Sequence, residues 1–176
     1  MSDKTINVLF LCTGNSARSI VAECVLNRFG QGRFKAYSAG SHPAGEVNPV
    51  ALRLLERQGY SIDALHSKSW DEFEQPDAPP MDFIFTVCDN AAHETCPLWL
   101  GHPVSAHWGL TDPAAVQGSD ADKDAAFKAT HRMLLERIKS FVALPFETLD
   151  EHHLRRQLDA IGCRDDGPAT VAERSA

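Results

Sequence analysis

Four segments of the chain are rich in apolar residues and have the length of strands. They cover residues 7–12 (NVLFLC), 33–40 (RFKAYSAG), 81–88 (MDFIFTVC) and 103–110 (PVSAHWGL). The first and third are apolar almost without interruption, which is typical of parallel strands that are buried on both faces of a sheet. We therefore predict a central sheet of four strands that is mainly parallel.

Segments with helical character separate and follow these strands. They cover residues 17–30, 48–59, 120–142 and 147–162, and the segment 69–81 begins as a helix and breaks at its prolines. Within 120–142, apolar positions recur every three or four residues and form one stripe: Phe127, Thr130, Leu134, Ile138 and Phe141. The alternation of strands and helices predicts an α/β fold, a three-layer sandwich of the flavodoxin-like kind around the parallel sheet.

The character of the chain changes after Pro145. Residues 1–145 contain all the predicted strands and are expected to form one domain, with enough length for a single core. Residues 146–176 contain one charged helix and then a polar segment, and we expect them to be a C-terminal extension of that domain.

Composition and charge narrow the classes of function. The 176 residues are 43% hydrophobic and 23% charged, and the formal net charge is −7. A nucleic-acid partner is not expected, because such binding depends on cationic contacts with phosphates. No apolar run approaches the roughly 18 residues of a membrane span, and the start, MSDKTINVLF, lacks the pattern of an export signal. We expect a cytoplasmic protein without a membrane partner, in which the five cysteines are reduced thiols.

Candidate chemistry begins where the first predicted strand ends. Cys12 is the last residue of that strand, and a helix follows a few residues later. At this edge of a parallel sheet, backbone N–H groups and the positive end of the helix dipole form a cradle for a tetrahedral oxyanion. Arg18 adds a bidentate and permanently charged clamp, and the same field favours the thiolate form of Cys12. The predicted substrate-binding residues are Thr13, Gly14, Asn15, Ser16, Ala17, Arg18 and Ser19.

Three residues of this loop have more specific expected roles. Gly14 and Asn15 tolerate the left-handed backbone conformations that a tight anion-binding turn requires. Ser19 is placed to hydrogen-bond the sulfur of Cys12. A buried strand before the loop and a helix after it distinguish this arrangement from a chance C-x5-R spacing.

Two further cysteines lie at and beyond the end of the third predicted strand. The ends of strands one and three lie on the same rim of a parallel sheet, so Cys88 can approach Cys12 if the intervening loop is mobile. Seven residues separate Cys88 from Cys96, and these two can exchange if the segment between them bends. Three thiols within reach of one another allow a relay, in which each thiolate attacks the sulfur bonded to the previous one.

The motif CTGNSARS (residues 12–19) resembles the phosphate-binding loop of the low-molecular-weight protein tyrosine phosphatase fold. Two chemistries occur on that fold, phosphomonoester hydrolysis and arsenate reduction. The cysteine pair in TVCDNAAHETCP (86–97) and the segment HWGLTDPA (107–114) make the chain similar to the thioredoxin-coupled arsenate reductases of bacteria. The resemblance covers roughly residues 6–143.

This resemblance implies a role for each residue of the site, with arsenate as substrate and thioredoxin as partner. Cys12 would attack arsenic, while Arg18 and the loop backbone would bind the oxyanion. Asp112 would be the general acid that protonates the departing oxygen. Cys88 would then attack the Cys12–arsenic adduct, which releases arsenite and leaves a Cys12–Cys88 disulfide. Cys96 would pass the disulfide outward as Cys88–Cys96, and no cofactor or resident metal is implied.

Two alternatives to this function remain open. A tyrosine phosphatase of this fold usually carries aromatic residues after its Asp-Pro, which flank the substrate ring, whereas DPAAVQG (112–118) offers nothing to stack. The other alternative is an arsenate reductase that is coupled to glutathione and glutaredoxin, or to mycothiol. It stays open because the spacing between Cys88 and Cys96 is one residue longer than the family pattern.

Several other residues have the right chemistry for a site but milder expected roles. Five residues are zinc-capable ligand types: Cys88, His93, Cys96, His102 and His107. Their spacing fits no common zinc finger, so we do not predict a metal site. His107 and Trp108 are expected to pack beside the Asp112 loop and to orient it.

Two cysteines and three polar residues remain among the candidate site residues. Cys24 is expected to be a core residue and Cys163 an ordinary thiol of the polar end segment. Asn15, Glu23 and Ser38 match positions that shape the loop and, in some reductases of this fold, hold potassium. The segment HSKSWDEF (66–73), which would supply the remaining ligands, departs from that pattern.

Overall fold

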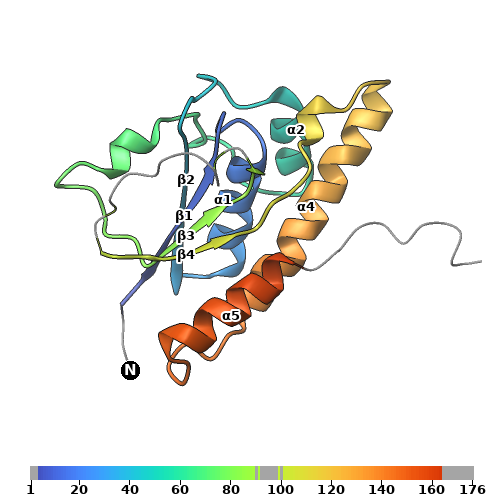
Figure 1. Cartoon of the computed structure of the whole chain (residues 1–176). Coiled ribbons are helices and arrows are strands. Elements are labelled where there is room, and N and C mark those ends of the chain that lie inside the picture. Colours follow the sequence, from blue (N-terminus) through green and yellow to red (C-terminus); the bar gives the residue numbers. More distant parts are fainter. Residues whose placement is uncertain (1–3, 90, 92–98, 100, 164–176) are drawn as a thin grey trace, which may run out of the picture.

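A four-stranded sheet forms the centre of the molecule (Figure 1). The computed structural model describes residues 4–89, 91, 99 and 101–163. The strands are β1 (Ile6–Cys12), β2 (Phe34–Gly40), β3 (Phe83–Thr86) and β4 (Val104–His107). They are parallel and lie in the order β2-β1-β3-β4. The predicted α/β fold with a four-stranded parallel sheet is thereby confirmed.

The register of the sheet brings the ends of the strands to one rim. Cys12 pairs with Gly40 of β2, and Thr86 of β3 pairs with His107 of β4. β3 and β4 are shorter than their apolar runs predict, because the chain leaves regular pairing after Thr86 and after His107. The run beyond β4 is apolar because Trp108 enters the core, where it is fully buried. The apolar runs therefore predict correctly which residues are buried, but they do not predict where each strand ends.

Helices cover one face of the sheet (Figure 1). In the described part of the chain the helices are α1 (Arg18–Phe29), α2 (Pro49–Arg57), α4 (Asp120–Val142) and α5 (Glu151–Gly162), and α2 packs against α1 and α4. α1 packs on β1 and β2, α5 packs on β4, and α4 contacts both α1 and α5. The side chains of Val8, Phe10 and Cys12 belong to the core between the sheet and these helices.

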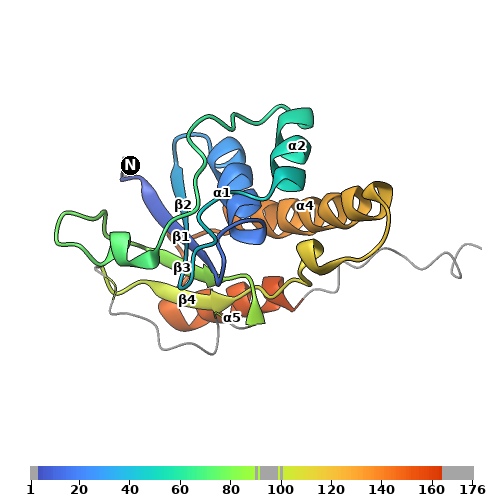
Figure 2. The ribbon, with the colours of Figure 1, turned by 90° about the horizontal axis from the view of Figure 1, so that it is seen from above.

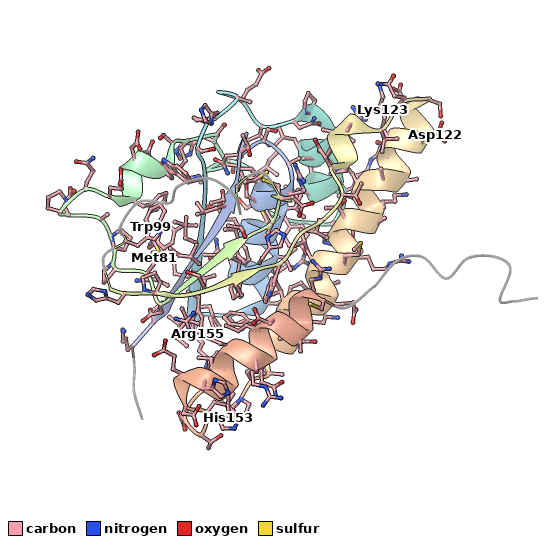
Figure 3. All side chains as sticks on the ribbon, viewed as in Figure 1. Met81, Trp99, Asp122, Lys123, His153 and Arg155 are labelled. Atoms are coloured by element: carbon pink, nitrogen blue, oxygen red, sulfur yellow. The ribbon has the colours of Figure 1, made fainter. Side chains whose placement is uncertain are left out.

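A shorter layer covers the opposite face of the sheet, as Figure 2 shows. Leu9, Leu11 and Ile84 point to that side, where they join a second cluster of buried residues. The short 3-10 helix η1 (Trp70–Phe73) packs over this cluster. Met81 and Trp99, labelled in Figure 3, lie on this side of the sheet, away from α4. Continuous apolar residues in β1 are thus explained by burial on both faces.

The helix boundaries follow from capping residues that the sequence contains. Asn48 accepts a hydrogen bond from Val50 N at 2.9 Å and begins α2, as its sequence predicts. Ser119 and Asp122 form a reciprocal capping box at the start of α4. The predicted stripe of α4 is confirmed, since all five of its residues are buried.

α5 completes the helical face. Leu158 and Ile161 are buried, and Trp108 Nε1 donates a hydrogen bond of 3.0 Å to Leu158 O. The outer side of α5 is charged, with His153 and Arg155 exposed (Figure 3). The boundary after residue 145 stays a prediction. Within the described residues, no helix combines the length and the apolar character that a membrane span requires.

Candidate active site

The loop between β1 and α1 encloses a small cavity at the C-terminal rim of the sheet. Its volume is about 200 Å³, and it is lined by Cys12, Thr13, Gly14, Ser16, Ala17, Arg18, Asp112 and Ala114. α1 begins at Arg18, and among the described residues no side chain caps its first turn. The N–H groups at this helix end are therefore available to an anion. Asn15 and Ser19 are fully buried and lie beneath the cavity rather than in its lining.

Hydrogen bonds to neighbouring segments orient the peptide groups of the loop. Three loop carbonyls accept backbone hydrogen bonds of 2.8–2.9 Å from outside the loop: His42 to Thr13, Ala44 to Gly14 and Asn48 to Ser16. A peptide N–H points away from the carbonyl of the same peptide group, so carbonyls that face outward direct N–H groups inward. One of these, the N–H of Gly14, donates to the sulfur of Cys12.

Buried side chains support the loop from below. Asn15 has a φ of 43°, which confirms the left-handed conformation predicted for it. Its Nδ2 donates to Ser19 Oγ at 2.9 Å, and its Oδ1 accepts from Lys68 N at 2.9 Å. A Cβ at Gly40 would lie 2.4 Å from Thr13 O, so only glycine lets β2 approach the loop this closely.

Arg18 is held at the edge of the cavity with part of its guanidinium unused. Its Nη1 donates to Leu110 O at 2.9 Å, and its Nη2 lies 3.8 Å from Asp112 Oδ2. Its Nε is buried and has no hydrogen-bond partner within the described part of the chain. A buried donor without a partner is costly, so this N–H needs an acceptor. An oxyanion in the cavity would supply one.

Cys88 lies directly against the loop that begins after Cys12. Cys12 and Cys88 are 5% and 2% exposed, and their thiols are in hydrogen-bond contact. The sulfur of Cys88 also accepts hydrogen bonds from Thr13 N at 3.3 Å and Ala91 N at 3.4 Å, and lies 3.5 Å from Thr13 Oγ1. The approach of Cys88 to Cys12, which sequence reasoning allowed, is present in the folded chain.

The contact between the two thiols shifts their pKa values in opposite directions. Contact with Cys88 and burial raise the pKa of Cys12, although Arg18 acts to lower it. The same contact lowers the pKa of Cys88, assisted by the hydrogen bonds from Thr13 and Ala91. Sequence reasoning placed the thiolate on Cys12. In the folded chain the hydrogen bonds from Thr13 N and Ala91 N favour the thiolate form of Cys88 as well.

Asp112 faces the cavity from the segment after β4. It caps the 3-10 helix η2 (Pro113–Ala115), with Oδ1 accepting from Ala114 N at 2.9 Å. Its other oxygen, Oδ2, points toward Arg18, and its side chain is 43% exposed. A carboxyl group there reaches both the solvent and an anion bound to Arg18, which is the position that a general acid requires.

This combination of a Cys-x5-Arg loop and an aspartate on the facing loop agrees with a comparison with known families. The family model for low molecular weight phosphotyrosine protein phosphatase matches residues 7–157. The chain belongs to this family.

The relatives of this phosphatase-family chain include arsenate reductases. The arsenate reductase of Bacillus licheniformis is 37% identical over 142 residues, which are 80% of this chain and 96% of that protein. The solved arsenate reductase of Archaeoglobus fulgidus is 28% identical, with a TM-score of 0.61 over 78% of this chain and 99% of that one. A thioredoxin-dependent arsenate reductase of Corynebacterium glutamicum is 24% identical, with a TM-score of 0.55 over 79% and 64%, and shares the fold.

The residues that η2 places at the cavity of this phosphatase-family member have small side chains. Ala114 lines the cavity, and Ala115 follows it in η2. Neither can stack on an aromatic ring. A cavity of about 200 Å³ with this lining suits a compact oxyanion better than an aryl ester.

Two of the residues singled out from the sequence, Cys96 of the thiol relay and His93, lie outside the described residues. Within residues 4–89, 91, 99 and 101–163, no three His, Cys, Asp or Glu side chains are grouped to hold a metal ion. Of the zinc-capable residues, His107 is engaged with Thr86 Oγ1 at 2.7 Å and Asp89 Oδ1 at 2.9 Å.

Lys68 is a residue of the site that sequence reasoning did not single out. Glu23 accepts a hydrogen bond of 2.7 Å from Ser38 Oγ, and Lys68 Nζ lies 4.0 Å from Glu23 Oε2. Lys68 is 7% exposed, and its Nζ also donates to His66 O at 3.1 Å. Burial raises the pKa of Glu23, while Lys68 counteracts this. The ammonium group of Lys68 thus lies beside the Glu23 carboxylate, one of the residues that the family resemblance associated with potassium.

The other cysteines have no part in this geometry. Cys24 is 8% exposed, and burial raises its pKa to about 12, which fits the core role predicted for it. Cys163 is exposed at the end of α5. A second cavity, of about 390 Å³, lies beside α1 and is larger than the cavity that the loop encloses. Its lining includes Cys24, Arg28 and Tyr60. The raised pKa of Cys24 makes this thiol a poor nucleophile for that cavity.

Proposed function

We propose that this protein reduces arsenate to arsenite. The observation that carries the proposal is the second thiol, Cys88, in contact with the nucleophile of a phosphatase-type loop. Hydrolysis of a phosphate ester needs only the first thiol, whereas reduction needs two electrons, which a thiol pair supplies. The arsenate reductases among its relatives support the same chemistry.

The first step is attack of Cys12 on arsenate. Loop N–H groups and the Nε and Nη2 groups of Arg18 bind the oxyanion and neutralise its charge. The Cys12 proton leaves to the neighbouring Cys88 thiolate, and the Cys12 sulfur forms a bond to arsenic. An arsenic–oxygen bond breaks, and Asp112 protonates the departing oxygen, which leaves as water. Arsenic is still in the +5 state in this adduct.

The second step is the reduction itself. Cys88 loses its proton to an oxygen of the adduct and attacks the sulfur of Cys12. The sulfur–arsenic bond breaks, and its electron pair stays on arsenic, which leaves as arsenite in the +3 state. The two sulfurs have together lost two electrons and form the Cys12–Cys88 disulfide, so atoms and electrons balance.

The third step returns the protein to its reduced form. Cys96 attacks Cys88, which regenerates the Cys12 thiol and gives a Cys88–Cys96 disulfide. Thioredoxin then reduces this disulfide, in the cytoplasm. Glutathione with glutaredoxin, or mycothiol, is the alternative electron donor, and with these donors the role of Cys96 differs.

Hydrolysis of phosphate monoesters is a second candidate function. The loop, Arg18 and Asp112 suffice for it, because a Cys12–phosphate adduct could be released by water. Ala114 and Ala115 provide no wall for an aromatic substrate. We therefore expect phosphatase activity to be a minor property of the same site.

A coupled assay tests the proposal. Arsenate-dependent oxidation of NADPH is followed with thioredoxin and thioredoxin reductase, or with glutathione, glutaredoxin and glutathione reductase, beside an aryl-phosphate control. Cys12→Ser should abolish arsenite formation, and Cys88→Ser should allow the adduct but no turnover. Cys96→Ser should block multiple turnovers only with thioredoxin. Rapid aryl-phosphate hydrolysis without arsenite formation would reject the reductase function.

A further inference from the structure

The residue that follows Cys88 is tied to the end of the neighbouring strand. Asp89 Oδ1 accepts a hydrogen bond of 2.9 Å from His107 Nε2, at the C-terminal end of β4. The two side chains are 84% and 42% exposed, so the contact lies at the surface beside the site. It does not line the anion cavity.

The imidazole of His107 is fixed from its other side. Its Nδ1 lies 2.7 Å from Thr86 Oγ1, and Thr86 is its cross-strand partner in the sheet. In the neutral ring, Nδ1 accepts from the Thr86 hydroxyl while the Nε2 proton is donated to Asp89. The ring cannot turn without losing both hydrogen bonds. The position of Asp89 is therefore fixed relative to β3 and β4 through the His107 ring.

Gly109 makes room for this pair. A Cβ at Gly109 would lie 2.6 Å from His107 Nε2 and 2.9 Å from Asp89 Oδ1. Between His107 and Gly109, Trp108 points into the core and donates to Leu158 O. Within the tripeptide His-Trp-Gly, Trp108 therefore anchors the end of β4 in the core. His107 and Gly109 shape the contact with Asp89.

Cys88 is consequently fixed on both of its sides. Before it, Val87 N donates to Leu11 O at 2.9 Å, which ties that residue to β1. After it, Asp89 is tied to His107. We propose that His107, acting through Asp89, is a positioning residue that holds the sulfur of Cys88 against Cys12. This rests on the proposed function only in giving Cys88 the role of resolving thiol.

Asp89 provides the sharpest variant, because its exposed side chain can be removed without opening the core. Asp89→Ala removes the acceptor, and Asp89→Asn keeps an oxygen at the same place. Asp77→Ala is the matched control, since Asp77 is another exposed aspartate and does not line the anion cavity. Gly109→Ala forces a methyl group into the pair and is a second, independent perturbation.

The readout is closure of the Cys12–Cys88 disulfide in the reduced, full-length protein after addition of diamide, an oxidant that needs no arsenate. Samples are quenched in acid, and the disulfide is quantified by peptide mapping. We expect Asp89→Ala to slow closure about tenfold, because a hydrogen bond that orders Cys88 is lost. Asp89→Asn should stay within about twofold of wild type, and Asp77→Ala should match wild type.

Arsenate turnover supplies the second readout. Asp89→Ala and Gly109→Ala should lower kcat and leave the KM for arsenate unchanged, because the anion loop is intact. The inference is overturned if closure in Asp89→Ala proceeds at the rate of Asp77→Ala, or if Asp89→Asn is as slow as Asp89→Ala. If wild type makes no arsenite but the diamide result holds, the proposed function fails and the positioning role of His107 stands.

Discussion

Replacement of Cys88 by alanine is expected to lower the pKa of Cys12. In the folded chain the hydrogen bond between the two thiols is the largest cause that raises this pKa, because it stabilises the protonated form of Cys12; burial and the charge of Cys88 act in the same direction. Removing the Cys88 sulfur removes that cause. The hydrogen bond from Gly14 N and the charge of Arg18, which both favour the Cys12 thiolate, remain.

The size of the change follows from the burial of the pair. Cys12 and Cys88 are 5% and 2% exposed, so water screens their contact little. A hydrogen bond to a charged group contributes about 1.5–3 kcal/mol, which corresponds to roughly one to two pKa units. We therefore expect the pKa of Cys12 in Cys88→Ala to lie about one to two units below its value in the wild-type protein.

Alkylation with iodoacetamide across pH measures this shift. The modified peptide containing Cys12 is quantified by mass spectrometry, which separates it from the other thiols. Cys163→Ser is the control, since Cys163 is exposed at the end of α5 and its loss should leave the Cys12 profile unchanged. An unchanged or higher pKa of Cys12 in Cys88→Ala would refute the assignment of this shift to the contact with Cys88.

Three further substitutions test the support of the loop. Arg18→Lys should weaken binding of phosphate or arsenate about tenfold or more, measured by calorimetry, because a lysine lacks the Nε donor that is buried without a partner among the described residues. Gly40→Ala should lower the unfolding free energy by about 1–3 kcal/mol and weaken the same binding, because its Cβ would displace Thr13. Lys68→Met should raise the pKa of Glu23 further, since Lys68 acts to lower it. A folded state that binds the proton more tightly than the unfolded chain loses stability as pH rises through the two pKa values. Urea unfolding should therefore show a greater loss of stability for Lys68→Met at pH 8 than at pH 5.

Local patterns in the sequence were enough to predict the architecture and the anion loop. β1 is recognisable because both of its faces are buried, and α4 because its apolar residues recur on one side. The loop was predictable because its parts are consecutive in the chain: a strand, Cys12, a turn and Arg18 at the first residue of a helix. The left-handed conformation at Asn15 was expected for the same reason.

Contacts that form only in the folded chain shift the pKa values of the two thiols. Sequence reasoning placed the thiolate on Cys12, because the helix dipole and Arg18 are local to it. The pKa of Cys88 is lowered as well, because Thr13, 75 positions away in the chain, and the nearby Ala91 direct their N–H groups at that sulfur. No spacing in the sequence reports which of two thiols will receive more donors.

The sequence by itself determined that a thiol and an arginine share the loop between the first strand and the first helix, at the rim of a parallel sheet, because hydrophobic periodicity and chain order are sufficient for that. Only the tertiary structure decided what surrounds the loop. It buried Lys68 beside Glu23, and it fixed Asp89 to His107. Both contacts join residues whose side chains meet only once strand register and helix packing are set, and pairwise electrostatics depends on that distance and burial rather than on sequence spacing.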